Sequence, residues 1–186
     1  MKNRLLLLIL LSISWFGFSS LILEDGAELP LKKINKAVAK IWKVDEFEVI
    51  EDDLNNQKNC YENGCWLKVK SKGKDLGMVY VGRVNSCHAG GCSVEPTSEP
   101  SLSFEFFDYF LLVDNSGEVL WVKVYNYQAT QGHEVMSRGW LNQFKGLTKN
   151  EKLVFGQDIE TISGATVSAS AITADIQQVL SCVTEF

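Results

Sequence analysis

A short run near the C-terminus, Ser163-Gly164-Ala165-Thr166, combines hydroxyl groups with small neighbours where an amphipathic helix is predicted to begin. The first turn of a helix has N–H groups without intrahelical acceptors, and these groups bind anions such as phosphate. Ser163 is a favourable N-cap residue, because its oxygen can accept hydrogen bonds from the amides of Ala165 or Thr166. On its own the run is more typical of an ordinary capped helix. Its chemical interpretation is a phosphate ester on the Thr166 hydroxyl, made by a separate catalyst because threonine is a weak nucleophile.

The cysteines form a second group of residues with chemical potential. Cys60 and Cys65 make one C-x4-C pair, Cys87 and Cys92 make another, and Cys182 stands alone. In an exported protein the favoured interpretation is structural disulfides, within or between the pairs. Four thiolates in two pairs are also compatible with a metal or iron–sulfur site. Cys182, on the last predicted helix, is expected to be a small buried apolar residue.

The N-terminus indicates export. Lys2 and Arg4 precede an uncharged run of nineteen residues, Leu5 to Leu23. At ~1.5 Å per residue this run reaches roughly 28 Å, enough to cross a hydrocarbon core. A cleaved signal peptide and a retained membrane anchor stay equally open. Either places the rest outside the cytoplasm, at the periplasmic face of the inner membrane or, if the signal is cleaved, secreted or free in the periplasm. A formal net charge of −5 with scattered basic residues argues against a nucleic-acid partner.

The rest of the chain carries strand patterns that pair as hairpins, together with a few helix patterns, which predicts an α+β fold with antiparallel hairpins packed against a few helices. We expect residues 1–23 to be the signal or anchor, 24–101 an N-terminal part, and 102–186 a second part of the same domain. The closing helix carries an apolar stripe from Ile172 to Val183. The other predicted elements are a helix over 31–44, strands over 46–50, 66–70, 78–84, 104–113 and 119–127, and a short helix over 137–144.

The stretch from Phe106 to Thr173 resembles the FMN-binding domain that occurs in two membrane redox complexes, the sodium-translocating NADH:quinone reductase and the Rnf complex, and in stand-alone exported proteins. The matching motifs occur in the same order. They are the turn Asp114…Gly117-Glu118-Val119, the loop Thr130-Gln131-Gly132, the run Trp140…Phe144…Gly146, and Ile162-Ser163-Gly164-Ala165-Thr166.

This resemblance implies covalent FMN. In the family, a flavin transferase that uses FAD joins the phosphate of FMN to the last threonine of the motif, which is Thr166 here. Ser163, Gly164 and Ala165 would then supply the backbone near the phosphate. The family usually has Asp three residues before the serine, and this chain has Glu160 there. The carboxylate is kept but is one methylene longer.

The resemblance also implies which residues lie near the flavin ring. It places the Gly132 loop against the flavin, with Trp140 as the nearest aromatic candidate, although Trp140 is equally typical of a core residue. His133 and Glu134 are candidates for influencing flavin protonation, and an exposed loop pair is the simpler interpretation. Asp158 is an alternative to Glu160 as the motif carboxylate.

Three functions follow from these patterns. The favoured one is a membrane-associated electron carrier that holds FMN on Thr166 and exchanges electrons with a membrane redox partner, because the attachment motif is complete and no catalytic set accompanies it. The second is a flavin- and thiol-dependent reductase that uses Cys87 and Cys92, with His88 as a thiolate modulator or metal ligand. The third is a flavin-free, disulfide-stapled binding domain.

Overall fold

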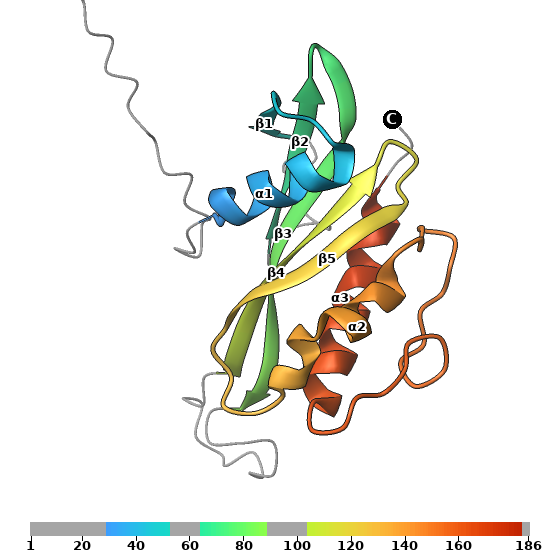
Figure 1. The fold of residues 1–186 in the computed structure, drawn as a ribbon. Coiled ribbons are helices and arrows are strands. Elements are labelled where there is room, and N and C mark those ends of the chain that lie inside the picture. Colours follow the sequence, from blue (N-terminus) through green and yellow to red (C-terminus); the bar gives the residue numbers. More distant parts are fainter. Residues whose placement is uncertain (1–28, 53–63, 89–103, 184–186) are drawn as a thin grey trace, which may run out of the picture.

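The computed structural model describes residues 29–52, 64–88 and 104–183 (Figure 1). The predicted signal or anchor, Cys60, Cys92 and the connector at 94–101 lie outside these residues. Within the described ranges, no helix combines the length and the apolar character that crossing a membrane requires.

The described strands form one antiparallel sheet in which each strand pairs with the next along the chain (Figure 1). The sheet joins strands from both sides of residue 102, and it confirms the predicted α+β class and both predicted hairpins. The strands, in spatial and chain order, are β1 (Glu48–Glu51), β2 (Gly64–Ser71), β3 (Lys74–His88), β4 (Phe104–Asp114) and β5 (Val119–Tyr127).

Helices cover both faces of the sheet (Figure 1). On one face lie α3 (Thr166–Cys182) and α2 (Arg138–Leu141), the latter flanked by the 3-10 turns η3 (His133–Met136) and η4 (Asn142–Phe144). On the other face lies α1 (Leu31–Trp42), which buries Ile34, Ala37 and Val38 as its period predicts.

Strand β4 supplies both cores because its side chains alternate between the two faces. Phe107, Tyr109, Leu111 and Val113 belong to the core beneath α3, whereas Phe110 and Leu112 belong to the core beneath α1. The predicted stripe of α3 is confirmed, since Ile172, Ile176, Val179, Leu180 and Val183 are all buried.

The β4–β5 turn is held by the Asp114 side chain. Its Oδ1 accepts hydrogen bonds from the amides of Ser116, at 2.8 Å, and Glu118, at 3.0 Å. Gly117 has φ +82°, a conformation that glycine adopts without steric cost. The turn therefore fixes the register that the two strands carry toward their other end.

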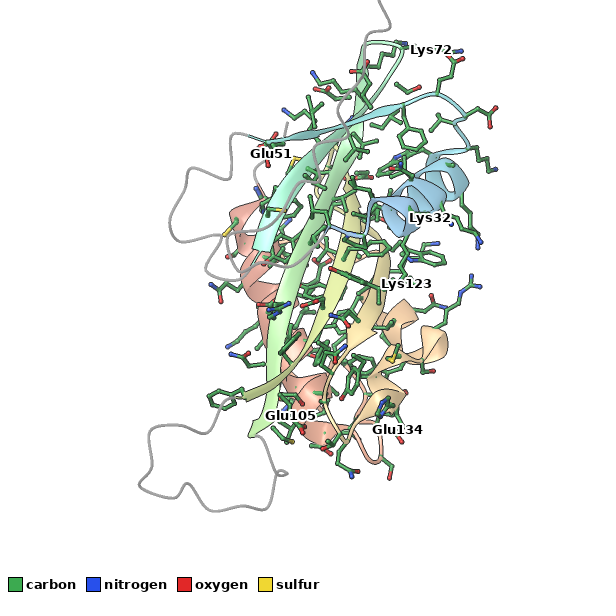
Figure 2. The ribbon with its side chains drawn as sticks, turned by 90° about the vertical axis from the view of Figure 1, so that its left-hand side faces the viewer. Lys32, Glu51, Lys72, Glu105, Lys123 and Glu134 are labelled. Atoms are coloured by element: carbon green, nitrogen blue, oxygen red, sulfur yellow. The ribbon has the colours of Figure 1, made fainter. Side chains whose placement is uncertain are left out.

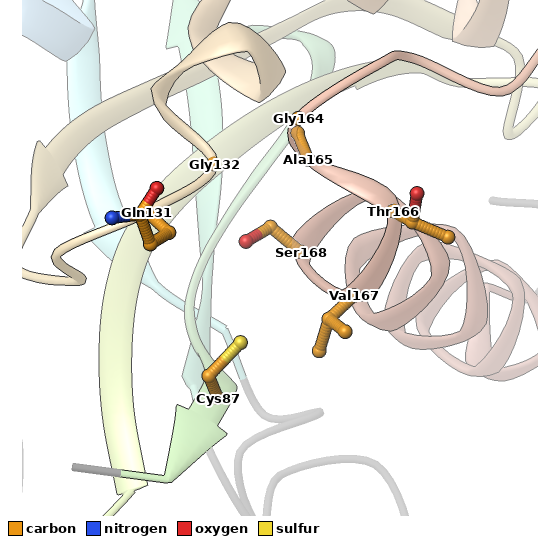
Figure 3. Close-up of a pocket in the computed structure, with 8 residues that line it drawn as sticks. All are labelled: Cys87, Gln131, Gly132, Gly164, Ala165, Thr166, Val167 and Ser168. Carbon is orange, nitrogen blue, oxygen red and sulfur yellow. The ribbon is translucent and has the colours of Figure 1, made fainter. Parts of the chain in front are cut away.

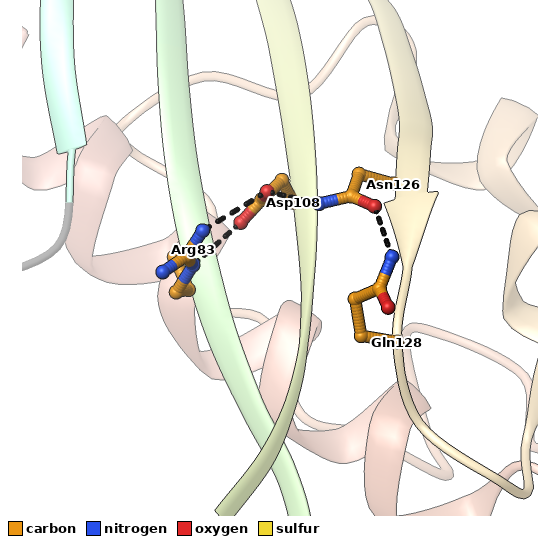
Figure 4. A network of polar contacts seen from close by, with 4 residues as sticks. All are labelled: Arg83, Asp108, Asn126 and Gln128. Carbon is orange, nitrogen blue, oxygen red and sulfur yellow. Dashed lines mark hydrogen bonds and ion pairs between the residues drawn. The ribbon is translucent and has the colours of Figure 1, made fainter. Parts of the chain in front are cut away.

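A polar network crosses three strands on the α1 face of the sheet (Figure 4). Asp108 is only 3% exposed, and its carboxylate accepts hydrogen bonds from Arg83 Nε at 2.8 Å and from Asn126 Nδ2 at 2.7 Å. Gln128 Nε2 donates in turn to Asn126 Oδ1 at 2.6 Å. The ion pair and these hydrogen bonds offset the cost of burying the Asp108 charge, so β3, β4 and β5 stay joined beyond the end of α1.

A half-buried carboxylate lies on the α3 side. Tyr109 in β4 donates its hydroxyl proton to Asp175 Oδ2 of α3 at 2.6 Å. Burial raises the pKa of Asp175 from 3.8 to about 6, and the hydrogen bond from Tyr109 opposes that rise. Protonated Asp175 is thus favoured in the folded state. Its stabilising contribution is complete below pH ~4 and is lost as the pH rises through about 6.

We expect Asp175→Asn to remove most of this pH dependence, because asparagine stays neutral and can still accept the Tyr109 proton. At pH 7.5 the free energy of unfolding should exceed that of the wild type by roughly 2–3 kcal/mol. Urea unfolding at pH 4.5 and 7.5 measures the difference. Asp45→Asn, at an exposed carboxylate, is the control. An unchanged pH slope in Asp175→Asn would contradict the assignment.

Candidate functional site

A pocket of about 270 Å³ lies where three distant parts of the sequence meet (Figure 3). The end of β3 contributes Cys87, the loop after β5 contributes Gln131 and Gly132, and the start of α3 contributes residues 164–168. The structure therefore brings the Gly132 loop and the residues Gly164, Ala165 and Thr166 of the motif together.

The start of α3 differs from the prediction. The helix begins at Thr166 with Ala165 as its N-cap, and no side chain of the described residues caps it. Ser163 lies earlier, inside a turn closed by the bond from the Ala165 amide to the Ile162 carbonyl at 3.3 Å. The predicted N-cap role of Ser163 is therefore wrong, because Gly164, with φ +84°, redirects the chain before the helix begins. The N–H groups of the first turn are left for another acceptor.

Thr166 lies on the rim of the pocket and is exposed. Figure 3 shows its side chain directed away from Cys87, whereas Val167 and Ser168 lie on the side of the helix that faces Cys87 and the Gly132 loop. Val167 is 43% exposed. The pocket therefore has a polar, accessible rim at Thr166 and an apolar edge at Val167.

Three hydroxyl groups meet at the inner side of the pocket. Ser168 Oγ lies 2.8 Å from Ser86 Oγ and 2.9 Å from the Tyr127 hydroxyl. Tyr127 donates its proton to the Gln131 carbonyl at 2.6 Å. Ser168 is 2% exposed and Ser86 is 6% exposed. Burial raises the pKa of Tyr127, and the hydrogen bonds with Ser168 and Ser86 oppose this rise.

Gly132 allows its loop to approach these hydroxyls. It is buried with φ +90°, and a Cβ at this position would lie 2.7 Å from both Ser168 Oγ and the Tyr127 oxygen. Only glycine meets both the conformational and the spatial requirement.

His133 and Glu134 lie beside the pocket without lining it. The His133 ring packs on Tyr127 with a centroid distance of 4.6 Å. The Glu134 carboxylate lies about 3.3 Å from where a Cβ on Gly164 would stand. Figure 2 shows Glu134 and Glu105 at the same end of the molecule, opposite the turn that contains Lys72.

Trp140, Glu160 and Asp158 do not line the pocket. Trp140 is buried, and its Nε1 donates to the Glu160 carbonyl at 2.7 Å. The Glu160 amide donates to Gln143 Oε1 at 2.8 Å, and Asp158 Oδ2 accepts from the Val154 amide at 2.9 Å. These bonds shape the segment that leads into the Ser163–Thr166 run.

The cysteines differ from two expectations. Cys87 and Cys182 are both disulfide-bonded, so the prediction that Cys182 is an unpaired apolar residue is wrong. Cys65 is a free thiol, which corrects its assignment to a disulfide. No group of three or more metal-ligating side chains occurs in the described ranges. The disulfide at Cys87 also removes the thiolate that the four-cysteine metal alternative requires. The side chain of His88 lies outside the description.

A comparison with known protein families matches the part of the chain that contains most of the pocket residues. The sequence profile described as "FMN-binding domain" matches residues 107–181. The match covers less than half of the chain and supports an FMN-binding protein. The match runs from the middle of β4 to the last turn of α3 and includes the Gly132 loop and the whole start of α3. A comparison with curated proteins gave no match.

The residues at the start of α3 fit the phosphate part of FMN. The uncapped N–H groups of α3 suit a phosphate. The missing Cβ atoms do not add room for the cofactor, because at Gly132 the space is filled by Ser168 and Tyr127 and at Gly164 by the Glu134 carboxylate. Cofactor pockets are usually roughly 300–1,000 Å³ in volume. At about 270 Å³ the part of the pocket formed by the described residues lies just below this range.

Sequence reasoning missed Ser168 as a lining residue, together with the Ser86 and Tyr127 hydroxyls behind it. A signal was present, because Ser168 precedes Ile172 and Ile176 at intervals of four residues and so falls on the buried stripe of α3. A polar residue on such a stripe needs a hydrogen-bond partner. Nothing in the strand patterns identified Ser86 or Tyr127 as that partner.

We expect Cys65 to be unreactive in the native protein. Burial, with a smaller contribution from the Glu51 charge, raises its pKa from 9.0 to about 12, so almost no thiolate forms near neutral pH. Iodoacetamide at pH 8 followed by peptide mass analysis should leave Cys65 unmodified in the native protein and alkylate it in denaturant. Rapid native alkylation would show that its environment is wrong.

Gly132→Ala should destabilise the protein more than a comparable change elsewhere. Gly73→Ala is the matched control, since Gly73 has φ +74° but no heavy atom within 4 Å of its added Cβ. The control should cost about 1 kcal/mol of backbone strain, and Gly132→Ala roughly 1–3 kcal/mol more because it also displaces Ser168 and Tyr127. Urea unfolding measures both, and equal losses would contradict the close approach.

Proposed function

We propose that this protein is an exported electron carrier that holds FMN through a phosphoester on Thr166. The observation that carries the proposal is the start of α3 within the stretch that matches the FMN-binding domain. There an exposed threonine hydroxyl stands beside uncapped helix N–H groups, at a pocket closed by the Gly132 loop.

The choice of Thr166 rests on accessibility. Among the described residues, two with hydroxyl groups line the pocket, Thr166 and Ser168. Ser168 is buried and hydrogen-bonded to two other hydroxyls, whereas Thr166 is exposed. A flavin transferase that uses FAD would therefore form its bond from Thr166 Oγ to phosphorus and release AMP. The helix N–H groups would then hold the phosphate.

The exposed edge of the pocket supports a carrier. Bound FMN supplies electron transfer, and the protein positions the cofactor and controls access to it. A ring that extends over the rim, next to the exposed Val167, stays within reach of a redox partner. Within the described part of the chain, the lining residues hold no acid–base pair for substrate turnover.

The proposed location has two supports. The basic and apolar N-terminal sequence is typical of a signal or an anchor over residues 5–23, and the disulfide-bonded Cys87 and Cys182 suit an oxidising compartment. We place the domain at the periplasmic face of a membrane, where a membrane reductase would be its redox partner.

One observation favours the second function as an alternative. Cys87 is disulfide-bonded and lines the same pocket. In a thiol-dependent reductase, two electrons from reduced flavin and two protons would convert this disulfide into two thiols. Counting thiols after anaerobic reduction of the flavin separates the two functions, because a carrier gains none.

The proposal predicts that wild-type protein produced with a flavin transferase gains the mass of one FMN group and fluoresces on a denaturing gel. Thr166→Ala should abolish both signals, and Thr166→Ser should retain them because it keeps the hydroxyl. Thr161→Ala, an exposed threonine outside the pocket lining, is the matched control and should be modified fully.

Two results would contradict the proposal. Modification of Thr166→Ala would place the ester elsewhere. An unmodified wild-type mass beside an active transferase would favour the flavin-free binding domain.

A further inference from the structure

The hydroxyl groups of Ser86, Ser168 and Tyr127 form a hydrogen-bonded chain that ends at the Gln131 carbonyl. This last acceptor determines which hydroxyl donates in each bond. The Gln131 carbonyl can only accept, so Tyr127 uses its single proton for that bond. Tyr127 therefore accepts from Ser168, and Ser168, whose proton is then used, accepts from Ser86. The protons run in one direction, from Ser86 to Ser168 to Tyr127 to Gln131.

This direction determines what the inner wall of the pocket offers a ligand. Each hydroxyl oxygen has two lone pairs. Ser168 Oγ uses one of them for the Ser86 proton and keeps the other, and it has no proton left to donate. Ser168 lines the pocket and is 2% exposed, so water satisfies little of this remaining capacity. The wall at Ser168 thus accepts hydrogen bonds and does not suit a phosphate, which needs donors.

Two parts of one ligand would therefore bind in different places. The phosphate belongs at the uncapped N–H groups of α3, and a neutral group with O–H donors belongs at Ser168. In FMN the group next to the phosphate is the ribityl chain, which carries three hydroxyls. Thr166 and Ser168 both line the pocket but are two residues apart on one helix, about 3 Å along its axis and roughly 200° around it. A ribityl chain that starts at Thr166 would therefore cross the open first turn of the helix to reach Ser168.

We propose that Ser168 Oγ accepts a hydrogen bond from a ribityl hydroxyl of the FMN held on Thr166, with Ser86 and Tyr127 fixing the orientation of the serine. The inference rests on the proposed function and deepens it, since it assigns a binding residue that the attachment motif does not include. Gly132 contributes by letting the Gln131 carbonyl reach Tyr127, which sets the direction of the chain.

The test compares the thermal midpoint of flavinylated and unmodified full-length protein, with mass analysis confirming one FMN group in each flavinylated sample. Flavinylation should raise the midpoint of the wild type. In Ser168→Ala this increment should fall by about 2–4 °C, the size expected for one hydrogen bond in a protein of this length. Ser170→Ala, an exposed serine on the same helix, should keep the full increment.

Ser86→Ala separates ligand binding from a structural role. It removes a buried hydroxyl of the same chain but leaves Ser168 with a second unused lone pair, so the increment should be kept even though the unmodified variant is less stable. Equal increments in Ser168→Ala and wild type would overturn the inference, as would equal losses in Ser86→Ala and Ser168→Ala.

A further measurement changes the cofactor and keeps the wild-type protein. Wild-type protein loaded from an FAD analogue without the three ribityl hydroxyls should show the small increment of Ser168→Ala, and a full increment would overturn the inference. Normal flavin mass with unaltered increments refutes only the ribityl contact. Absence of flavin on the wild type refutes both the proposed function and the ribityl contact with Ser168.

Discussion

The close approach of the Gly132 loop to the first turn of α3 is the constraint on which the site depends. Because Gly132 has no side chain, the Gln131 carbonyl reaches the Tyr127 hydroxyl and the loop closes over Ser168. That contact joins the end of β5 to the helix, and the hydrogen bond between Ser168 and Ser86 joins the helix to β3. Three segments distant in sequence thereby share one pocket.

The rest of the fold fixes the position of the Gly132 loop relative to the start of α3. Strand β4 is buried on both faces, so α1 and α3 pack on a sheet that cannot shift by one residue without exposing apolar side chains. The Arg83–Asp108 pair and Asn126 continue the cross-strand bonding beyond α1, toward the end where the pocket lies. The Asp175–Tyr109 bond ties α3 to the sheet from within. These interactions hold the start of α3 in place while leaving its N–H groups available.

The sequence predicted the elements better than the details of the site. The hairpins and the stripe of α3 follow from side-chain periods of two and 3.6, which are local properties. The N-cap was misplaced because Ser163 has the right chemistry, but the positive φ of Gly164 moves the helix start to Thr166. The bonding of Cys65 and Cys182, and the meeting of Ser86 with Ser168, depend on which distant segments become neighbours. No local pattern contains that information.

The most direct measurement of the central claim is a comparison of backbone amide NMR spectra of the protein with and without FMN on Thr166. If the phosphate is held at the uncapped start of α3, the largest shifts will occur at the amides of residues 164–168 and extend to Gly132 and Cys87. The amides of α1, on the opposite face, will change little. Large shifts along α1 with an undisturbed start of α3 would contradict the account.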